Sequence, residues 1–282
     1  MSEPVCYLNG AFLPLDQAKI SVLDRGFIFG DAIYEVIPVY HRKPLCLAGH
    51  LARLRRSLDQ VRIPSPHTDS EWSELITKLI SRGEHGDQGI YLQISRGVAK
   101  RDFGLPQGIT PTVFMLGTPF TATSREQLER GIAAVSMTDF RWLRCDIKST
   151  SLLGANMLRQ FAYDAGGVES IMFRDGHLTE GSSSNVFIAK EGKLIAPPKS
   201  HLILPGITYD LLLELAVNGG VPSEVREVLE AEVKTADEIM LSASLRECVA
   251  VTQLDGKPVG NGKPGAIFKQ MRKLFDDYTA SL

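Results

Sequence analysis

The sequence lacks closely spaced cysteines, which excludes the small disulfide-rich folds. Its four cysteines, Cys6, Cys46, Cys145 and Cys248, lie far apart, and no Cys-x-x-Cys pair occurs. Disulfide frameworks and zinc sites both depend on cysteines at short, regular spacings. The pattern therefore predicts reduced thiols in a cytosolic protein and no metal site.

Charge of one sign and long apolar runs are lacking as well. The chain has 31 lysines and arginines against 33 acidic residues, so its formal net charge is only -2. Such a balance gives no reason to expect nucleic acid or anionic lipid as a partner. No apolar stretch approaches membrane-spanning length, and the opening residues MSEPVCYLNG resemble no secretory signal. We therefore expect a cytoplasmic protein with neither nucleic acid nor a membrane as a partner.

Repeats and low-complexity segments are also missing, and the 282 residues mix hairpin and helix signals. Asn9-Gly10 between two short apolar runs predicts a hairpin, and the alternation from Ala32 to Tyr40 predicts a strand. Leucines at helical spacing follow Leu51, and Thr68 with Glu71 forms a capping-box pattern before a second helix. This mixture favours the α+β class over a doubly wound sheet.

A domain boundary is expected in the segment 117–124, GTPFTATS, because it is small, polar and contains proline. We therefore predict an N-terminal α/β domain over residues 1–119 and a C-terminal mixed α/β domain over residues 120–282. The second domain would carry Lys148, the residue on which the functional hypothesis depends.

A chemical role for Lys148 needs local support, because most lysines are solvated surface charges. The residues before it are largely apolar: Trp142, Leu143, Cys145 and Ile147. An ammonium group among such neighbours loses solvation, and a desolvated amine is more readily neutral and able to attack a carbonyl. Arg141 and Arg144 act in the same direction through their positive charge. The hydroxyl residues 149–151 are expected to cap a following helix and so to fix the lysine at a rigid junction.

Two side chains are candidates for binding a small acidic ligand. Tyr34 points away from the strand face that carries Ile33 and Glu35, so it either enters a cavity or packs half-buried. Arg101 lies in the long basic loop of residues 96–106, and loops carried on sheets often hold substrate-binding residues. We therefore treat Arg101 as a candidate carboxylate clamp.

Two weak anion sites are also indicated. Arg53, Arg55 and Arg56 share the polar face of the helix after Leu51, where arginines are usually solvated. A later helix opens at LPGIT, residues 204–208, and its first N–H groups are unpaired, which favours an anion. Neither signal is specific by itself.

Three runs, in this order and spacing, resemble the fold type IV pyridoxal-phosphate enzymes and most closely the D-amino acid aminotransferases: DRGFIFGDAIYEV, RWLRCDIKSTSLLGA and LTEGSSSNVF. The resemblance covers nearly the whole chain. It implies a two-domain subunit that forms a homodimer, with pyridoxal 5′-phosphate between the domains. It also implies a ping-pong transamination in which a D-amino acid such as D-alanine donates its amino group and 2-oxoglutarate or pyruvate accepts it.

The resemblance also implies roles for individual residues. Lys148 matches the lysine that binds the cofactor covalently and then moves the substrate proton, and Glu180 matches the carboxylate that pairs with the pyridine nitrogen. Tyr34 and Arg101 match residues that hold the substrate carboxylate, the arginine reaching in from the partner subunit. The other residues matched to cofactor contacts, around the phosphate and the ring, are Arg53, Ile207, Thr208, Ser244, Ser183 and Ser184.

One departure from the family pattern concerns substrate choice. Well-known members carry Arg-x-His in the basic loop, whereas this chain has Arg101-Asp102-Phe103. The carboxylate clamp is therefore one donor short, and the loss of a hydrogen bond to a charged group weakens binding by roughly 1.5–3 kcal/mol. Lys100 and Arg246 are the candidate replacements.

Two other reactions on the same fold remain alternatives, those of a branched-chain L-amino acid aminotransferase and of a 4-amino-4-deoxychorismate lyase. The run YEVIP, residues 34–38, argues against the first alternative, because the family pattern of branched-chain enzymes at this point is Tyr/Phe-Glu-Gly-Ile-Arg. A cofactor-binding protein without turnover is a third possibility, which the intact Lys148 and Glu180 disfavour.

Overall fold

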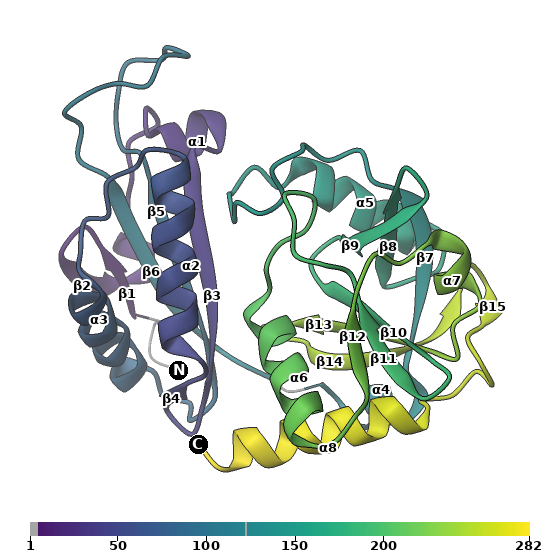
Figure 1. Cartoon of the computed structure of the whole chain (residues 1–282). Helices are drawn as coiled ribbons and strands as arrows, with labels where there is room; N and C mark the ends of the chain where they lie inside the picture. Colours follow the sequence, from purple (N-terminus) through teal and green to yellow (C-terminus); the bar gives the residue numbers. More distant parts are fainter. Residues whose placement is uncertain (1–4, 122) are drawn as a thin grey trace. The chain divides into compact units, whose positions relative to one another are not determined.

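The computed structural model describes residues 5–121 and 123–282 of the chain, which form two compact units (Figure 1). The first unit contains the described residues up to Thr121, together with Ile147–Leu152 and Leu282. The second contains the described residues from Thr123 to Asp146 and Leu153–Ser281. The boundary between residues 119 and 120 stays a prediction. The segment Ile147–Leu152, which contains Lys148, groups with the first unit although it follows residue 119 in the sequence.

An antiparallel six-stranded sheet forms the first unit, in the order β2-β1-β6-β5-β3-β4. The strands are β1 (Val5–Leu8), β2 (Ala11–Pro14), β3 (Ala32–Tyr40), β4 (Lys43–Pro44), β5 (Gln88–Ser95) and β6 (Thr112–Pro119). The predicted hairpin joins β1 to β2, and both of its turn residues, Asn9 and Gly10, have positive φ. The predicted strand Ala32–Tyr40 is β3, which pairs with β5 along almost its whole length.

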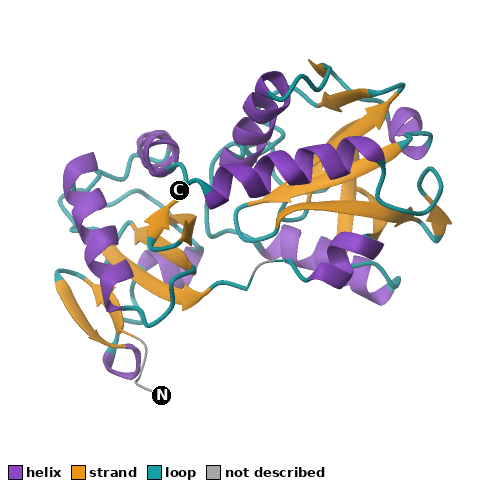
Figure 2. Cartoon of the chain, turned by 90° about the horizontal axis from the view of Figure 1, so that it is seen from below, coloured by secondary structure: helices purple, strands orange, loops and turns teal. Residues whose placement is uncertain are grey.

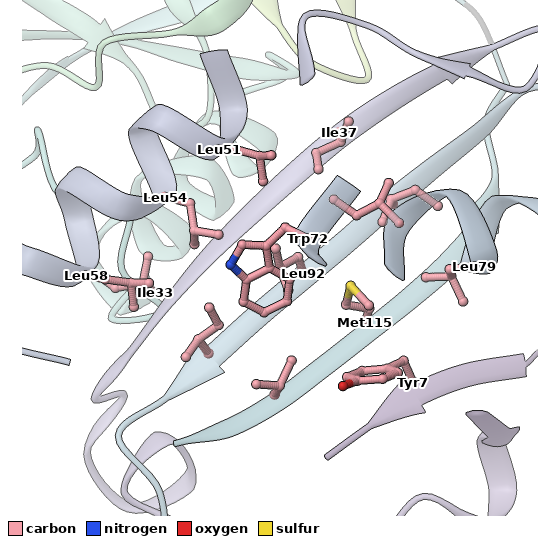
Figure 3. Close-up of a cluster of buried hydrophobic side chains, with 14 of the residues drawn as sticks. Tyr7, Ile33, Ile37, Leu51, Leu54, Leu58, Trp72, Leu79, Leu92 and Met115 are labelled. Carbon is pink, nitrogen blue, oxygen red and sulfur yellow. The ribbon is translucent and has the colours of Figure 1, made fainter. Parts of the chain in front are cut away.

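The helices of the first unit are α1 (Arg25–Phe29), α2 (Leu47–Gln60) and α3 (Asp69–Arg82), with a short 3-10 turn at Leu15–Gln17. The capping box at the start of α3 is confirmed, because Thr68 and Glu71 each accept a hydrogen bond from the other's backbone amide. Apolar side chains of α2 and α3 pack on those of the sheet. Figure 3 shows Leu51, Leu54, Leu58, Trp72 and Leu79 from the helices with Leu92 and Met115 from β5 and β6.

A nine-stranded mixed sheet forms the second unit, in the order β12-β11-β10-β13-β14-β7-β8-β9, with β15 added beside β14. The strands are β7 (Ile132–Thr138), β8 (Glu169–Arg174), β9 (His177–Gly181), β10 (Asn185–Lys190), β11 (Lys193–Ala196), β12 (Ser223–Val225), β13 (Glu238–Ala243), β14 (Glu247–Leu254) and β15 (Lys257–Pro258). The pairs β7–β8, β7–β14 and β11–β12 are parallel. Two sheets of this kind with helices packed on them make the α+β class that we predicted.

The helices of the second unit are α4 (Arg125–Arg130), α5 (Leu153–Asp164), α6 (Ile207–Asn218), α7 (Glu230–Lys234) and α8 (Ala266–Ala280), drawn in purple in Figure 2. Helix α5 begins at Leu153, beyond the hydroxyl residues 149–151 that we expected to cap it. The reason is that Thr150 donates its amide to Ala32 of β3 and so continues an extended backbone. Within residues 5–121 and 123–282, the helices all fall short of the length and apolar character that spanning a bilayer requires.

Candidate functional site

Lys148 lies on a segment that pairs with β3. The amide of Tyr34 donates to the carbonyl of Lys148 at 3.0 Å, and the amide of Thr150 donates to the carbonyl of Ala32 at 3.0 Å. Ser149, between them, forms an antiparallel bridge to the same strand. The lysine backbone is therefore fixed by strand pairing and not by the helix cap that we predicted.

The side chain of Lys148 lies against an aromatic ring. Its Nζ is 3.9 Å from the centroid of the half-buried Tyr34 ring, a distance at which the ring face stabilises a cation. Tyr34 therefore faces the amine. The predicted apolar surroundings are only partly present, because Trp142 and Leu143 are 48% and 59% exposed, whereas Ile147 is buried in the core of the first unit.

Arg53 is buried, which corrects the prediction that it shares a solvated face with Arg55 and Arg56; those two are exposed. Its Nε and NH2 donate to the two oxygens of Glu35 at 2.8 and 2.7 Å, and His50 Nδ1 lies 2.8 Å from Glu35 Oε2. His50 and Arg53 are about one turn apart on α2, so both contact the same carboxylate. Complete burial raises the pKa of Glu35, but the charge and hydrogen bonds of Arg53, with the hydrogen bond from His50, lower it to about 2.

Arg101 is exposed and lies beside two aromatic rings, Phe29 and Phe103, which also contact each other with their centroids 5.8 Å apart. Its guanidinium carbon is 5.4 Å from the Phe29 centroid and 5.6 Å from the Phe103 centroid. Phe103 therefore supplies an aromatic face beside Arg101, at the position where the family pattern has a histidine donor. The N–H donors of an exposed guanidinium suit a carboxylate.

The base of this loop is fixed by buried ion pairs. Asp31 accepts from Arg25 Nε at 2.8 Å and from Arg96 Nε at 2.7 Å. Burial alone would raise the pKa of Asp31, but hydrogen bonds from the two arginines and their charges lower it. Arg25 NH1 also donates to the carbonyl of Asp102 at 2.6 Å, which anchors the loop next to Arg101.

Glu180, on β9, is buried and belongs to a chain of ion pairs in which Arg141 lies between Glu180 and Asp139. Arg141 NH1 donates to its Oε1 at 2.7 Å, while Asn185 Nδ2 and the Leu204 amide approach its Oε2 at 3.3 and 2.9 Å. The other edge of the Arg141 guanidinium is held by Asp139, at 3.0 and 2.9 Å. Burial raises the pKa of Glu180, the charge of Asp139 adds to the effect, and the opposing groups, chiefly Arg141, do not cancel it.

The two arginines before Lys148 are thus paired with acids. Arg141 is bound to Asp139 and Glu180, and Arg144 Nε lies 3.0 Å from Asp146 Oδ1. These carboxylates compensate both positive charges within the second unit. The predicted action of the two charges on the lysine amine stays a prediction.

The turn of residues 182–184, between β9 and β10, is organised by the buried carboxylate of Glu169 on β8. Ser184 Oγ donates to Glu169 Oε2 at 3.0 Å, and Ser182 donates to Oε1 through its amide, at 3.1 Å, and through its hydroxyl. Ser183 is exposed, and its oxygen accepts a hydrogen bond from Arg159 NH2. Of the two serines predicted to surround the cofactor ring, Ser183 is therefore exposed and bound to Arg159, and Ser184 is buried and bound to Glu169.

Ile207 and Thr208 are the first residues of α6, and no side chain caps the helix start at Gly206. A Cβ at Gly206 would lie 2.1 Å from Asn185 Oδ1, so the helix start packs directly on a donor to the buried glutamate of β9. The first N–H groups of α6 have no side-chain cap, and the anion site at this helix start stays a prediction. Ser244 is half-buried and follows the end of β13.

The groups that hold the predicted residues in place were not identified from the sequence: Glu35, His50, Asp139, Arg159 and Glu169. A signal existed for two of them. Glu35 and Glu169 lie within apolar strands, and a charge in such a strand needs a buried partner. The partners themselves lie on other elements, so the sequence did not indicate them.

Comparison with known proteins finds relatives along nearly the full length. Residues 32–254 match the family described as amino-transferase class IV. The D-alanine aminotransferase of Bacillus licheniformis is 36% identical over 264 residues, which cover 94% of this chain and 93% of the relative. The D-alanine aminotransferase of Staphylococcus aureus (strain COL) is 36% identical over 275 residues, which cover 98% of each chain.

Solved structures share the same fold. The branched-chain amino acid aminotransferase of Escherichia coli superimposes with a TM-score of 0.93 at 26% identity, over 98% of this chain and 94% of that one. A branched-chain amino acid aminotransferase from a T.th. strain, solved with pyridoxamine 5′-phosphate, gives a TM-score of 0.94 at 22% identity, over 100% and 95%. These likenesses confirm the predicted fold.

Proposed function

The chain belongs to the class IV aminotransferases, and we propose that it transfers the amino group of a D-amino acid such as D-alanine to a 2-oxo acid, 2-oxoglutarate or pyruvate. The observation that carries this substrate class is the 36% identity, over nearly the whole of both chains, to proteins named D-alanine aminotransferase. Donor and acceptor bind in turn, in a ping-pong cycle.

Enzymes of this fold type use pyridoxal 5′-phosphate, and the side chains described above fit its chemistry. The cofactor needs an amine for its aldehyde, an anion for its ring nitrogen and donors for its phosphate. Lys148 offers the amine, Glu180 the anion, and the uncapped start of α6 the donors. A buried carboxylate with a raised pKa is stabilised as an anion by a cationic ring nitrogen. When bound, the protonated ring withdraws the electrons left by the departing substrate proton.

We assign two tasks to Lys148, covalent attachment of the cofactor and movement of the proton at the substrate α-carbon. The pairing of its segment with β3 supports this assignment, because a fixed backbone limits the positions that the amine reaches. Tyr34 orients the same amine through its ring face. Glu180, held by Arg141, keeps the ring nitrogen protonated.

We assign the phosphate to Arg53 and the start of α6, and the ring to the serine turn. Glu35 and His50 support the first assignment, because they hold the guanidinium of Arg53 in one orientation. The full set of proposed contacts is Arg53, Ile207, Thr208 and Ser244 for the phosphate, and Ser183 and Ser184 for the ring.

We assign the substrate carboxylate to Arg101 and Tyr34. Phe103 cannot donate a hydrogen bond, so a further cation is needed to complete the clamp. Lys100 is the better candidate, because it is exposed on the same loop and forms no ion pair with any described residue. Arg246 already contacts Glu169 at 3.2 Å and suits a different carboxylate, as argued below.

We further propose a homodimer. Val22, Phe27 and Phe103 are 72%, 69% and 82% exposed. Their two segments are joined by a bridge between Asp24 and Val98. Clustered exposed aromatic and aliphatic side chains are typical of an interface. Sedimentation should therefore give twice the 31.0 kDa of one chain. The four cysteines, all within the described residues and none in a disulfide, support a reducing, cytoplasmic location.

The function is tested with separate substrates. The holoenzyme is mixed with D-alanine, L-alanine, D-glutamate or L-leucine, with 2-oxoglutarate or pyruvate as acceptor, and its visible absorbance is followed. We expect the D-isomers alone to remove that absorbance and to yield a new D-amino acid. A response to L-isomers alone would favour a branched-chain enzyme, which the fold also serves. Pyruvate release from aminodeoxychorismate without an acceptor would favour a lyase.

Lys148→Ala tests the assigned amine. Turnover should be lost, because no other group would move the α-proton. Lys78→Ala is the matched control, since Lys78 is an exposed lysine on α3 of the same unit. Full turnover by Lys148→Ala would contradict the assignment.

A further inference from the structure

Two arginines of the second unit surround one buried carboxylate. Glu169 Oε2 accepts from Arg159 NH2 at 2.7 Å and from Arg246 NH1 at 3.2 Å. Within the described residues no second carboxylate pairs with either arginine. The cluster therefore carries one uncompensated positive charge. Its outer side reaches the surface, since the side chains of Arg159 and Arg246 are 19% and 30% exposed.

Glu169 has no capacity left to balance that charge. Its two oxygens also accept from the amide of Ser170, from the amide and hydroxyl of Ser182, and from the hydroxyl of Ser184. The excess positive charge acts on Arg246. Burial lowers the pKa of Arg246, the charge of Glu169 raises it, and the charge of Arg159 lowers it further. A second anion on the outer side would relieve this repulsion.

The cluster lies beside the residues assigned to the cofactor. Strand β10 begins at Asn185, which pairs with Ser242 near the end of β13. The turn of residues 182–184 and the turn after β13 therefore lie at the same end of these two strands. Arg246 lies in the second turn, two residues after Ser244. Ser183, which accepts a hydrogen bond from Arg159, lies in the first turn and is exposed.

We propose that Arg246, together with Arg159 and Ser183, binds the second carboxylate of a dicarboxylic substrate, such as 2-oxoglutarate or glutamate. The inference rests on the proposed function and adds the substrate class. Guanidinium groups suit this task, because their N–H donors match the two oxygens of a carboxylate. Only NH1 of Arg246 is engaged by Glu169, so its other donors serve the ligand. A monocarboxylate such as pyruvate gains nothing from this site.

The test uses binding without reaction. Glutarate has the length and both carboxylates of 2-oxoglutarate but no carbonyl, and butyrate has one carboxylate on a chain of similar length. Calorimetric titration of the holoenzyme should show tighter binding of glutarate than of butyrate. In Arg246→Gln the glutarate affinity should fall at least about tenfold, as expected for a lost charge-assisted hydrogen bond, while the butyrate affinity stays unchanged. Arg246→Lys should keep part of the preference, because it keeps the charge.

Folding should survive these changes, since Glu169 keeps Arg159 and its serine donors. Arg130→Gln is the matched control, because it removes an equal charge from an exposed arginine of α4 in the same unit. With turnover as a second readout, Arg246→Gln should raise KM for 2-oxoglutarate and leave KM for pyruvate unchanged.

Three results would overturn the proposal. The first is a wild type that binds glutarate no more tightly than butyrate. The second is an Arg246→Gln variant with both affinities unchanged, and the third is a variant in which both affinities fall equally. The last result would mean that Arg246 acts only by holding the serine turn. A holoenzyme that prefers glutarate but transaminates no D-amino acid would contradict the proposed function and leave the anion site intact.

Discussion

Two buried glutamates, Glu35 in the first unit and Glu180 in the second, differ in the direction of their pKa shifts. Each contacts an arginine nitrogen at 2.7 Å, Glu35 that of Arg53 and Glu180 that of Arg141. The pKa of Glu35 is nevertheless lowered to about 2, whereas the pKa of Glu180 is raised. Burial acts upward at both sites, so the difference lies in what opposes burial.

The comparison shows that the number of arginine donors, and whether a second acid shares the arginine, decides the outcome, because each glutamate has three donor contacts in total. Arg53 gives two nitrogens to Glu35, and His50 adds a third contact. Arg141 gives Nε and NH2 to Asp139, so only NH1 is left for Glu180. Glu35 is therefore a permanent anion that holds an arginine, while the proton affinity of Glu180 is adjustable by its neighbours.

The largest effect is expected for Glu35→Gln, which removes a charge and leaves Arg53 buried without its carboxylate. Breaking a buried ion pair in this way costs roughly 3–5 kcal/mol of the free energy of unfolding. Urea unfolding of cofactor-free protein measures the loss. Glu74→Gln, at an exposed glutamate of the same unit, should cause no measurable change. Equal stability of Glu35→Gln and the wild type would remove the basis of the comparison.

The pH dependence of the same variant checks the sign. The folded pKa of Glu35, about 2, lies below the ordinary value of 4.5. Its stabilising contribution is therefore complete above pH 4.5 and is lost as the pH falls toward 2. The stability gap between wild type and Glu35→Gln should shrink over that window, and a constant gap would contradict the lowered pKa.

The parts of the fold predicted from the sequence are those set by local chemistry. Asn9-Gly10 made a hairpin, Ala32–Tyr40 a strand, and Thr68 with Glu71 a helix cap. Turn and cap residues act on backbone groups a few positions away, so their patterns are readable in one sequence. The position of Lys148, by contrast, depends on pairing with β3, more than one hundred residues earlier in the chain.

Arg53 shows the same limit within the site. Its position beside Arg55 and Arg56 indicated a solvated face, and only the approach of Glu35 from β3 explains its burial. Asp139 and Glu169 likewise gain their roles from elements that are distant in sequence. The resemblance supplied the expected functional residues, but the groups that orient them became visible only in the structure.

Asp139→Asn is expected to have an intermediate effect and to make Glu180 resemble Glu35. Removing the Asp139 charge takes away one cause of the raised pKa of Glu180. Arg141 then has Glu180 as its charged partner on this side, so the pKa of Glu180 should fall. NMR titration of cofactor-free protein with 13C-labelled glutamate carboxyls reports this value. Weakened hydrogen bonds to a charged group should also cost about 1.5–3 kcal/mol of stability. Asp164→Asn, at an exposed position on α5, is the control; a higher pKa of Glu180 in Asp139→Asn would contradict the charge-sharing argument.

The smallest effect on stability is expected for Glu180→Gln, although the substitution is chemically identical to Glu35→Gln. Arg141 keeps Asp139, and a glutamine oxygen still accepts from the amide of Leu204, so the cost in cofactor-free protein should be only about 0.5–1.5 kcal/mol. The change in its stability with pH, relative to the wild type, should also be opposite to that of Glu35→Gln.

A raised folded pKa means that the contribution of Glu180 is complete below pH 4.5 and is lost as the pH rises through the folded pKa. Glu180→Gln should therefore approach or exceed the wild type in stability as the pH rises toward neutrality, whereas Glu35→Gln falls further below it. Urea unfolding of both variants at a series of pH values measures the two trends. If they run in parallel, the two glutamates do not differ in the way that their arginines indicate.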